Sequence, residues 1–495
     1  MFTVKVLDID SGDELHAIIN QEVAEMLKVV GGDKIVVETK DKHTKLICDV
    51  EVDKTYTSHT IGLNSKAAAK LNQSAYSRGV MIYPAPKPKS IEYVRLKFEN
   101  KIRLEHSHFL EILEDIINNS YSKVETTYFV LACSVHKLTD AEVIAFTQAM
   151  VDCGKHLEFS NVNRPIIVDK HCIGGVPNNR TTMLAIPLII AGGLTIPKTS
   201  SRSITSPAGT ADTMEVLANV ELNLDDMYHI VKNVGGCLAW GGALDLSPAD
   251  DMIIRVEHPL HIDTEDQMIA SILSKKKSAG STHVLIDIPY GPQTKVESLS
   301  KAKRLKKRFE VVGEAIGLTI SVEITNGSQP IGFGVGPYFE ALDVLAVLSN
   351  SPDAPKDLME KALVLTGKIF ELAKVCVKGK GYDLALKLLR SGRGFEVFEQ
   401  IRKAQGYKQL PEFPTYGEEI IARHDGIVQG IKNKAISKLA FIVGAPTTPT
   451  AGLIIKKKVG DKIQKGDILF ELYSESEVKI KYALEHLKDD FPYIY

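Results

Sequence analysis

The stretch VDKHCIGGVPNNRTT, residues 168–182, gathers residue types that can bind an anion. Lys170 carries a positive charge, and Gly174 and Gly175 let backbone amides approach a ligand closely. The apolar run before them predicts a strand, and the run after Thr181 predicts a helix, whose N-terminus also attracts negative charge. On this stretch alone two interpretations stay open: a phosphate site, or an ordinary strand–helix turn with a solvated lysine.

A second stretch, TSSRSITSPAGTADTMEVL at residues 199–217, surrounds one arginine with hydroxyl side chains. Hydroxyl groups can donate hydrogen bonds to phosphate or ribose oxygens, and the Arg202 guanidinium can hold an oxyanion through two parallel bonds. Thr210 stands before the helix that the segment DTMEVL predicts. An ordinary Ser/Thr-rich loop is the alternative, but two such loops after consecutive strands strengthen the case for an anion site.

Further along, single residues could do chemistry. Asp263 lies at the start of a predicted helix, where it is either a cap or, if burial raises its pKa, a proton donor. Ser271 and Lys275 lie one turn apart on one face of that helix. Lys295 follows an apolar strand, and a solvated lysine is the alternative there. His171 is a candidate catalytic group, with a structural hydrogen-bonding role as the alternative.

These residues need a scaffold, and the pattern around them predicts an α/β domain. The run PIIVD precedes a predicted helix, TTMLAIPLIIAGG, and HVLIDIPYG follows another, QMIASILSKKKSAG. Such alternation is typical of parallel strands with crossover helices. In these sheets, ligands bind in the loops beyond the carboxyl ends of the strands, where Lys170 and Lys295 fall.

The whole chain of 495 residues is too long for one core and predicts a multidomain α/β protein. The segment VGDKIQKGDILFEL resembles the biotinyl/lipoyl carrier fold, but it lacks a hairpin tip with a modifiable lysine, which favours a structural module over a carrier. The predicted domains are an N-terminal β-rich domain at 1–85, a helical domain at 86–160 that part of 207–235 could join, an α/β domain at 161–410, and a carrier-like (barrel-sandwich) α+β domain at 411–495. In the helical domain, Thr139 precedes an apolar helical pattern and is its predicted cap.

Composition excludes several classes of function. The net charge of −2 gives no basic field for nucleic acid, and the longest apolar stretch, MLAIPLIIAGG, is too short to span a membrane. Six cysteines lie far apart without a CxxC pair. This spacing is typical of reduced thiols in a cytoplasmic protein and predicts neither disulfides nor a metal site.

Several long motifs, taken in order, resemble one family. DKHCIGGVPNNRTT resembles the DKHSxGG signature of the pyrimidine nucleoside phosphorylases. SSRSITSPAGTADTMEVL, GCLAWGGALDLSPADD and ITNGSQPIG look like the longer branch of this thymidine/pyrimidine nucleoside phosphorylase family, which contains AMP phosphorylases and bacterial type 2 thymidine phosphorylases. The resemblance covers essentially the whole chain.

The resemblance implies phosphorolysis, in which phosphate attacks C1′ of a ribosyl group and the base departs. It implies a helical domain hinged to an α/β domain with the site between them, inorganic phosphate as co-substrate, no metal or organic cofactor, and a homodimer or larger homo-oligomer. By motif, Lys170 and Gly175 contact phosphate, Asp263 is the proton donor, and Lys275 contacts the base. The other implied nucleoside or nucleotide contacts are Ser201, Arg202, Ser203, Ile204, Thr205, Ser206, Thr210, Ser271 and Lys295.

Two positions depart from the pattern. Cys172 replaces the serine of the signature, and a thiol is a weaker hydrogen-bond donor than a hydroxyl. Asn178 and Asn179 stand where the longer branch usually has a glycine.

The resemblance leaves two phosphorylase reactions open, which differ in their substrate. The favoured hypothesis is phosphorolysis of a pyrimidine nucleoside, as in thymidine phosphorylase. This reaction gives free base and (deoxy)ribose 1-phosphate. Phosphorolysis of a nucleoside 5′-monophosphate (AMP, CMP or UMP) gives ribose 1,5-bisphosphate and needs cations for two phosphates, which Lys170, Arg202 and Lys295 could supply. Two further alternatives remain: a phosphoribosyltransferase, and a non-catalytic carrier or assembly protein.

Overall fold

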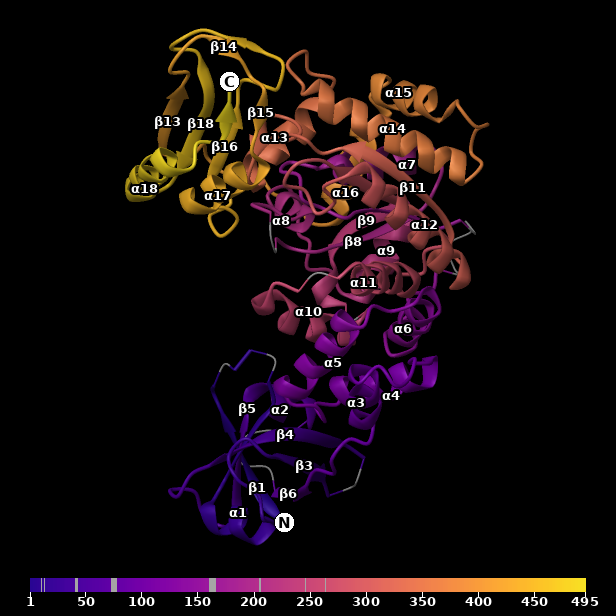
Figure 1. Cartoon of the computed structure of the whole chain (residues 1–495), viewed down its shortest axis with the longest axis vertical. Helices are drawn as coiled ribbons and strands as arrows, with labels where there is room; N and C mark the ends of the chain where they lie inside the picture. The colour runs from indigo at the N-terminus through magenta and orange to yellow at the C-terminus, as the bar shows by residue number, and fades with distance from the viewer. Residues whose placement is uncertain are drawn as a thin grey trace. The chain divides into compact units, whose positions relative to one another are not determined.

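The chain forms two units in the computed structural model, drawn in Figure 1. The first comprises Met1–Cys153 and Ser247–Ala270, and the second comprises Gly154–Leu246 and Ser271–Tyr495. The stretch 207–235, which could have joined the helical domain, lies in the second unit. No helix in the described ranges has the length and apolar character to cross a membrane. The structure describes residues 1–9, 11–12, 14–40, 43–72, 78–159, 166–203, 206–244, 246–262 and 264–495.

Strands near the start of the chain close into a barrel, in the order β1 (Phe2–Leu7), β5 (Thr60–Asn64), β2 (His16–Ile19), β4 (Lys45–Val52), β3 (Lys34–Thr39) and β6 (Arg78–Pro84). Successive side chains of a strand point to opposite faces, which places Val4, Ile35 and Ile61 in the apolar core. Two short helices, α1 (Gln21–Leu27) and α2 (Ser65–Lys70), lie between strands along the chain.

Beyond the barrel, the helices that lie wholly in the first unit are α3 (Ile91–Phe98), α4 (His106–Ile117), α5 (Lys123–Val135), α6 (Asp140–Asp152) and α10 (Pro248–Leu260). α6 begins with a capping box, in which the side chains of Thr139 and Glu142 accept hydrogen bonds from each other's amides. Glu142 also accepts a 2.6 Å hydrogen bond from the buried Lys97. The predicted cap at Thr139 is therefore confirmed.

A parallel sheet organises the second unit, with the strand order β11 (Thr319–Asn326), β10 (His283–Tyr290), β7 (Val168–Cys172). Asp287 on β10 pairs with Cys172 at the end of β7, so these strands end at the same edge. β8 (Ile196–Ser200) and β9 (Gly236–Trp240) form a second parallel pair. The Val168 amide donates to the Thr195 carbonyl at 2.9 Å and joins the two pieces. The predicted mixed α/β fold is confirmed.

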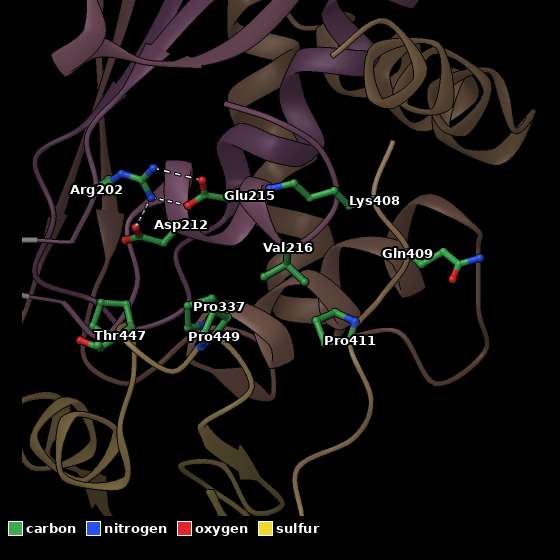
Figure 2. Close-up of a pocket in the computed structure, with 11 residues that line it drawn as sticks. Arg202, Asp212, Glu215, Val216, Pro337, Lys408, Gln409, Pro411, Thr447 and Pro449 are labelled. Carbon is green, nitrogen blue, oxygen red and sulfur yellow. Dashed lines mark hydrogen bonds and ion pairs between the residues drawn. The ribbon is translucent and has the colours of Figure 1, made fainter. Parts of the chain in front are cut away.

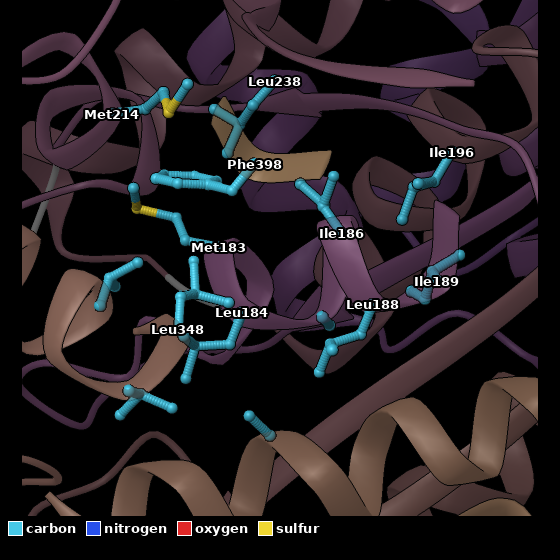
Figure 3. Close-up of a cluster of buried hydrophobic side chains, with 14 of the residues drawn as sticks. Met183, Leu184, Ile186, Leu188, Ile189, Ile196, Met214, Leu238, Leu348 and Phe398 are labelled. Carbon is cyan, nitrogen blue, oxygen red and sulfur yellow. The ribbon is translucent and has the colours of Figure 1, made fainter. Parts of the chain in front are cut away.

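Helix α7 (Thr181–Ala191) lies in the core of the second unit, where Figure 3 shows its apolar side chains in one cluster with those of Leu238, Leu348 and Phe398. Every residue from Thr181 to Ile190 is buried, because the helix is apolar on all sides. The predicted helix after the glycine pair is confirmed. The other helices of this unit's α/β part are α8 (Thr210–Glu215), α9 (Leu224–Val234), α11 (Glu265–Ser278, which begins in the first unit), α12 (Leu299–Ala315), α13 (Pro337–Leu348), α14 (Lys356–Leu372), α15 (Gly381–Arg390) and α16 (Arg393–Ala404).

The C-terminal domain, residues 416–494, shares a sheet with the α/β part. The order of this sheet is β12 (Gly334–Val335), β16 (Gly452–Ile455), β18 (Ile468–Ser474), β13 (Tyr416–Ile421), so a strand from the α/β part pairs with β16. The two parts therefore share backbone hydrogen bonds. The remaining elements of this domain are β14 (Gly426–Ile427), β15 (Gly430–Ile431), α17 (Asn433–Val443), β17 (Lys462–Ile463), α18 (Glu477–Asp489) and β19 (Tyr493–Ile494).

Helices α14 and α15 touch at two glycines. A Cβ on Gly367 would lie 2.5 Å from the Tyr382 nitrogen and 2.6 Å from the Gly381 carbonyl carbon. A glycine-to-alanine change inside a helix ordinarily stabilises by about 0.5–1 kcal/mol, but forcing a methyl group against a backbone costs about 1–3 kcal/mol. We therefore expect Gly367→Ala to lower the thermal unfolding midpoint. Val364→Ala, at a 36% exposed position of the same helix, is the control and should change stability by no more than about 0.5 kcal/mol. A midpoint for Gly367→Ala equal to or above wild type would contradict this packing.

Candidate active site

The loop after β7, residues 173–180 and called the glycine loop here, packs directly against the loop after β10. Gly174 and Gly175 both have φ of +90°, a conformation that favours glycine. A Cβ on Gly175 would lie 2.8 Å from the backbone nitrogen of Lys295 and 3.2 Å from Cα of Thr294. The structure thus brings together a predicted phosphate contact, Gly175, and a predicted nucleotide contact, Lys295, at the carboxyl edge of the sheet.

The prediction that Lys170 lies in the loop beyond a strand is wrong, because Lys170 is the middle residue of β7. It has no exposed surface, so the interpretation as a solvated lysine is wrong as well. Its Nζ donates to the hydroxyl of Thr181 at 2.7 Å and to that of Thr182 at 3.3 Å, in the first turn of α7. Burial lowers the pKa of Lys170, and the nearby Asp287 acts in the opposite direction. The lysine therefore places its charge at the N-terminus of α7, where an anion is also favoured.

Two buried aspartates, one on β7 and one on β10, hold further lysines. Asp169 lies 3.0 Å from Lys198 and 2.8 Å from Lys276. Asp287 lies 3.1 Å from Lys361 and accepts a 2.6 Å hydrogen bond from the hydroxyl of Thr325. Burial alone would raise the pKa of each aspartate, but the neighbouring lysines hold both pKa values below the ordinary one. Both carboxylates are therefore ionised at neutral pH.

The buried charges form two groups on opposite faces of β7, because consecutive residues of a strand point to opposite sides. Asp169 lies with Lys198 and Lys276, and Lys170 lies with Asp287 and Lys361. Burial and the neighbouring Lys276 lower the pKa of Lys198 to about 7, so this group is only partly charged at neutral pH. In the second group two lysines lie near one aspartate, so a bound anion would favour the charged form of Lys170.

His171 lies half-buried between these lysines. Burial and the positive charges of Lys276, Lys198 and Lys170 hold its pKa well below the ordinary value of 6.5. At neutral pH the imidazole is uncharged, so it can accept or donate a hydrogen bond but cannot supply a positive charge.

The positions that depart from the family signature contact one another. Cys172 Sγ accepts hydrogen bonds from the side-chain amide of Asn179 at 2.9 Å and from the Gly174 amide at 3.4 Å. Burial and the nearby Asp287 raise the pKa of the thiol to about 11, so it stays protonated. Asn178 has φ of 53°, a left-handed conformation that asparagine tolerates better than most side chains. This explains how asparagine can stand where a glycine is usual.

Arg180, which sequence reasoning did not single out, connects the two predicted anion-binding loops. Its guanidinium pairs with the buried Glu340 and donates to the hydroxyl of Thr210 at 2.8 Å and to the carbonyl of Ala208 at 2.6 Å. Glu340 stands in the first turn of α13, 160 residues along the chain. The sequence feature that could have indicated this role is the arginine in NNRTT at the start of a helix. Its partners could not be inferred, because they are far away in the sequence.

Arg202 is engaged by carboxylates. Its guanidinium pairs with Glu215, lies 3.4 Å from Asp212 and 3.1 Å from Glu221, and stacks over the Trp240 ring at 4.9 Å. Figure 2 shows it on the wall of a pocket of about 440 Å³. To hold an oxyanion, the Arg202 guanidinium would have to release the carboxylates of Glu215, Asp212 and Glu221. The pocket is also lined by Val216, Pro337, Lys408, Gln409, Pro411, Pro446, Thr447 and Pro449.

The hydroxyl groups near Arg202 make local bonds. Ser203 donates to the Ser206 carbonyl, and Ser206 donates to the Ala208 carbonyl at 2.8 Å. Ser201 is exposed. Ile204, Thr205 and the predicted proton donor Asp263 lie outside the described residues.

Helix α11 carries the remaining candidates. Ser271 and Lys275 are half-buried on this helix, and Lys276, the neighbour of Lys275, pairs with Asp169. The structure thus brings the C-terminal half of α11 next to β7. The ligand-binding roles of all these residues stay predictions.

Comparison with known proteins identifies the family. Residues 164–284 match the glycosyl transferase family a/b domain, and residues 427–493 match the pyrimidine nucleoside phosphorylase C-terminal domain. A protein of Rhodopseudomonas palustris named "Putative thymidine phosphorylase" is 41% identical over 97% of this chain and 93% of its own length. The chain belongs to the thymidine/pyrimidine nucleoside phosphorylase family. The predicted family resemblance is therefore confirmed.

Other relatives agree with this phosphorylase assignment. A protein of Acidovorax sp. named "Putative thymidine phosphorylase 1" is 45% identical over 87% of this chain and 83% of its own length. The crystal structure of anthranilate phosphoribosyltransferase from Thermus thermophilus aligns with a TM-score of 0.54 and 19% identity, over 63% of this chain and 98% of that one. This likeness shows a shared fold alone.

The charge around His171 gives a direct test of the site in this phosphorylase. We expect the His171 imidazole to remain neutral when the pH falls to 6.5, because burial and the surrounding lysines oppose its protonation. The ¹⁵N chemical shifts of the ring, assigned with the His171→Gln variant, measure the protonation directly. A titration midpoint at or above pH 6.5 would contradict the proposed positive environment.

Proposed function

We propose that this protein catalyses phosphorolysis of the N-glycosidic bond of a pyrimidine nucleoside, as a thymidine phosphorylase does. Inorganic phosphate is the co-substrate, and the products are free base and ribose or deoxyribose 1-phosphate. The observation that carries the proposal is the buried Lys170, which lies near Asp287 and places its Nζ on the hydroxyl groups at the first turn of α7, directly after the glycine loop. The names of the relatives, which align over most of the chain, support the same reaction.

The phosphate dianion would bind at the glycine loop. Backbone amides around Gly175 and the N-terminus of α7 would donate hydrogen bonds to it, and Lys170 would supply charge from below. These groups orient the dianion toward C1′ of the ribosyl group and neutralise part of its charge. As C1′ becomes cationic in the transition state, the held dianion stabilises it and then forms the new C–O bond.

The departing base gains negative charge, which a proton donor would neutralise. We assign this role to Asp263, with Ser271 and Lys275 as contacts of the nucleoside and Lys295 as a further cation near the phosphate. His171, uncharged at neutral pH, would serve as a hydrogen-bonding partner of the substrate. The reaction written in this way requires no metal or organic cofactor, since phosphate is itself the nucleophile.

One observation favours a nucleoside over a nucleoside monophosphate. A monophosphate substrate needs cations for a second phosphate, and Arg202 was the candidate on the Ser/Thr-rich loop. The pairing of Arg202 with Glu215, Asp212 and Glu221 opposes the entry of a second anion there, because three carboxylates would repel it. We further propose a homodimer or larger homo-oligomer in the cytoplasm, with a hinge between a helical and an α/β domain.

Product analysis tests the proposed reaction. Purified protein is incubated with thymidine, uridine, AMP, CMP or UMP, with and without phosphate, and free base is measured by chromatography. We expect phosphate-dependent release of base from thymidine or uridine. Base released only from monophosphates would overturn the nucleoside assignment, and base released from none of them would overturn the enzymatic proposal.

Replacement of the proposed acid tests the mechanism. We expect Asp263→Asn to lower kcat by about 10²–10⁴-fold with little change in KM, because an amide cannot donate the proton that the leaving base needs. Glu265→Gln, two residues away in the first turn of α11, is the control that should keep wild-type turnover. Loss of kcat and of substrate affinity to the same extent would contradict the role as an acid.

A further inference from the structure

The segment 327–336 between β11 and α13, called the bridging segment here, holds the glycine loop. The Ile331 amide donates to the carbonyl of Pro177 at 3.2 Å. Asn178, in its left-handed conformation, donates from its side-chain amide to Asp343 at 2.5 Å. The same carboxylate oxygen accepts the amides of Phe333 at 2.7 Å and Gly334 at 2.8 Å. Asp343 thus joins the glycine loop to the bridging segment.

The other side of the bridging segment is held by the C-terminal domain. Lys458 Nζ donates to the Pro330 carbonyl at 2.7 Å and to Asp357 at 3.2 Å. The Asp357 carboxylate in turn accepts the Gly332 amide at 3.1 Å. Asn433 donates to the carbonyl of Gly327 at 2.9 Å. The bridging segment therefore has fixed partners at both ends and in its middle.

The bridging segment and the glycine loop pack tightly against each other. Gly332 has φ of +67°, and a Cβ on it would collide with the side-chain nitrogen of Asn178 and lie 2.6 Å from Asp343. Only 17% of the Lys458 side chain is exposed, and only 7% of Asp343. Because a tightly packed interior transmits displacement, a shift of the bridging segment would move Asn178 and with it the glycine loop.

We propose that the C-terminal domain positions the phosphate-binding loop of this protein, with Lys458 as its principal positioning residue. Lys458 acts through Pro330, Gly332 and Asp343 on Asn178, and so fixes the backbone of the glycine loop before phosphate arrives. This inference rests on the proposed function, since it assumes that the glycine loop binds phosphate. It gives the carrier-like domain a task in the reaction that needs no covalent modification.

The test uses the full-length chain with Lys458→Met. We expect KM for phosphate to rise by about 3- to 30-fold, while kcat at saturating phosphate and KM for the nucleoside stay within about twofold of wild type. A general loss of stability would not produce this split. Lys458→Arg, which retains a cation able to reach Asp357, should recover most of the phosphate affinity.

The adjacent Lys457→Met is the matched control. Lys457 pairs at 2.9 Å with Asp467 inside the C-terminal domain, so its removal should leave KM for phosphate unchanged. If Lys458→Met does not fold, Gln329→Ala replaces it, because Gln329 holds the same segment by accepting the Val459 amide at 2.8 Å. An equal rise of KM for phosphate in Lys457→Met and Lys458→Met would overturn the inference.

Calorimetric titration with inorganic phosphate separates the two proposals without turnover. Wild-type protein that binds phosphate, with Lys458→Met binding it equally well, would overturn the positioning role and leave the proposed function intact. Weaker binding by Lys458→Met alone would support the positioning role. Wild-type protein that neither binds phosphate nor releases base would remove both proposals.

Discussion

The pairing of buried lysines with Asp169 and Asp287 is the constraint on which the rest of the site depends. A buried ammonium group without a partner costs several kcal/mol, so each lysine here requires a nearby carboxylate or hydroxyl group. The two aspartates lie on neighbouring strands, and the lysines reach them from β8, α11 and α14. This requirement fixes how the strands and helices meet at the carboxyl edge of the sheet. In the proposed function, a dianion bound at the glycine loop would add a second negative group beside Lys170, which lies near Asp287 alone among the two aspartates.

Because the cations belong to the core, the site can be formed before substrate arrives. Lys170 is held by the hydroxyl groups of Thr181 and Thr182, and Arg180 by Glu340 and Thr210. Groups that already point in the right direction lose little entropy on binding and need little reorganisation during the reaction. The sharing of backbone hydrogen bonds between β12 and β16 extends this rigidity to the C-terminal domain.

Local features of the fold could be predicted from the sequence, whereas contacts between residues far apart in the chain could not. The strand, the glycine turn and the buried helix after Thr181 follow from apolar periodicity and glycine chemistry, and the structure has all three. The burial of Lys170 was not predictable, because it depends on which helix covers the loop. Similarly, the partners of Arg202 and Arg180 come from other loops and helices. Local periodicity carries no information on such contacts.

Neighbouring residues on one helix illustrate the same limit. Lys275 was the predicted candidate, yet Lys276 is the residue paired with Asp169. Consecutive residues of an α-helix differ by about 100° in direction, so the sequence places both lysines on the helix but cannot decide which one faces the sheet. That choice depends on how α11 packs against β7, which is a property of the assembled unit.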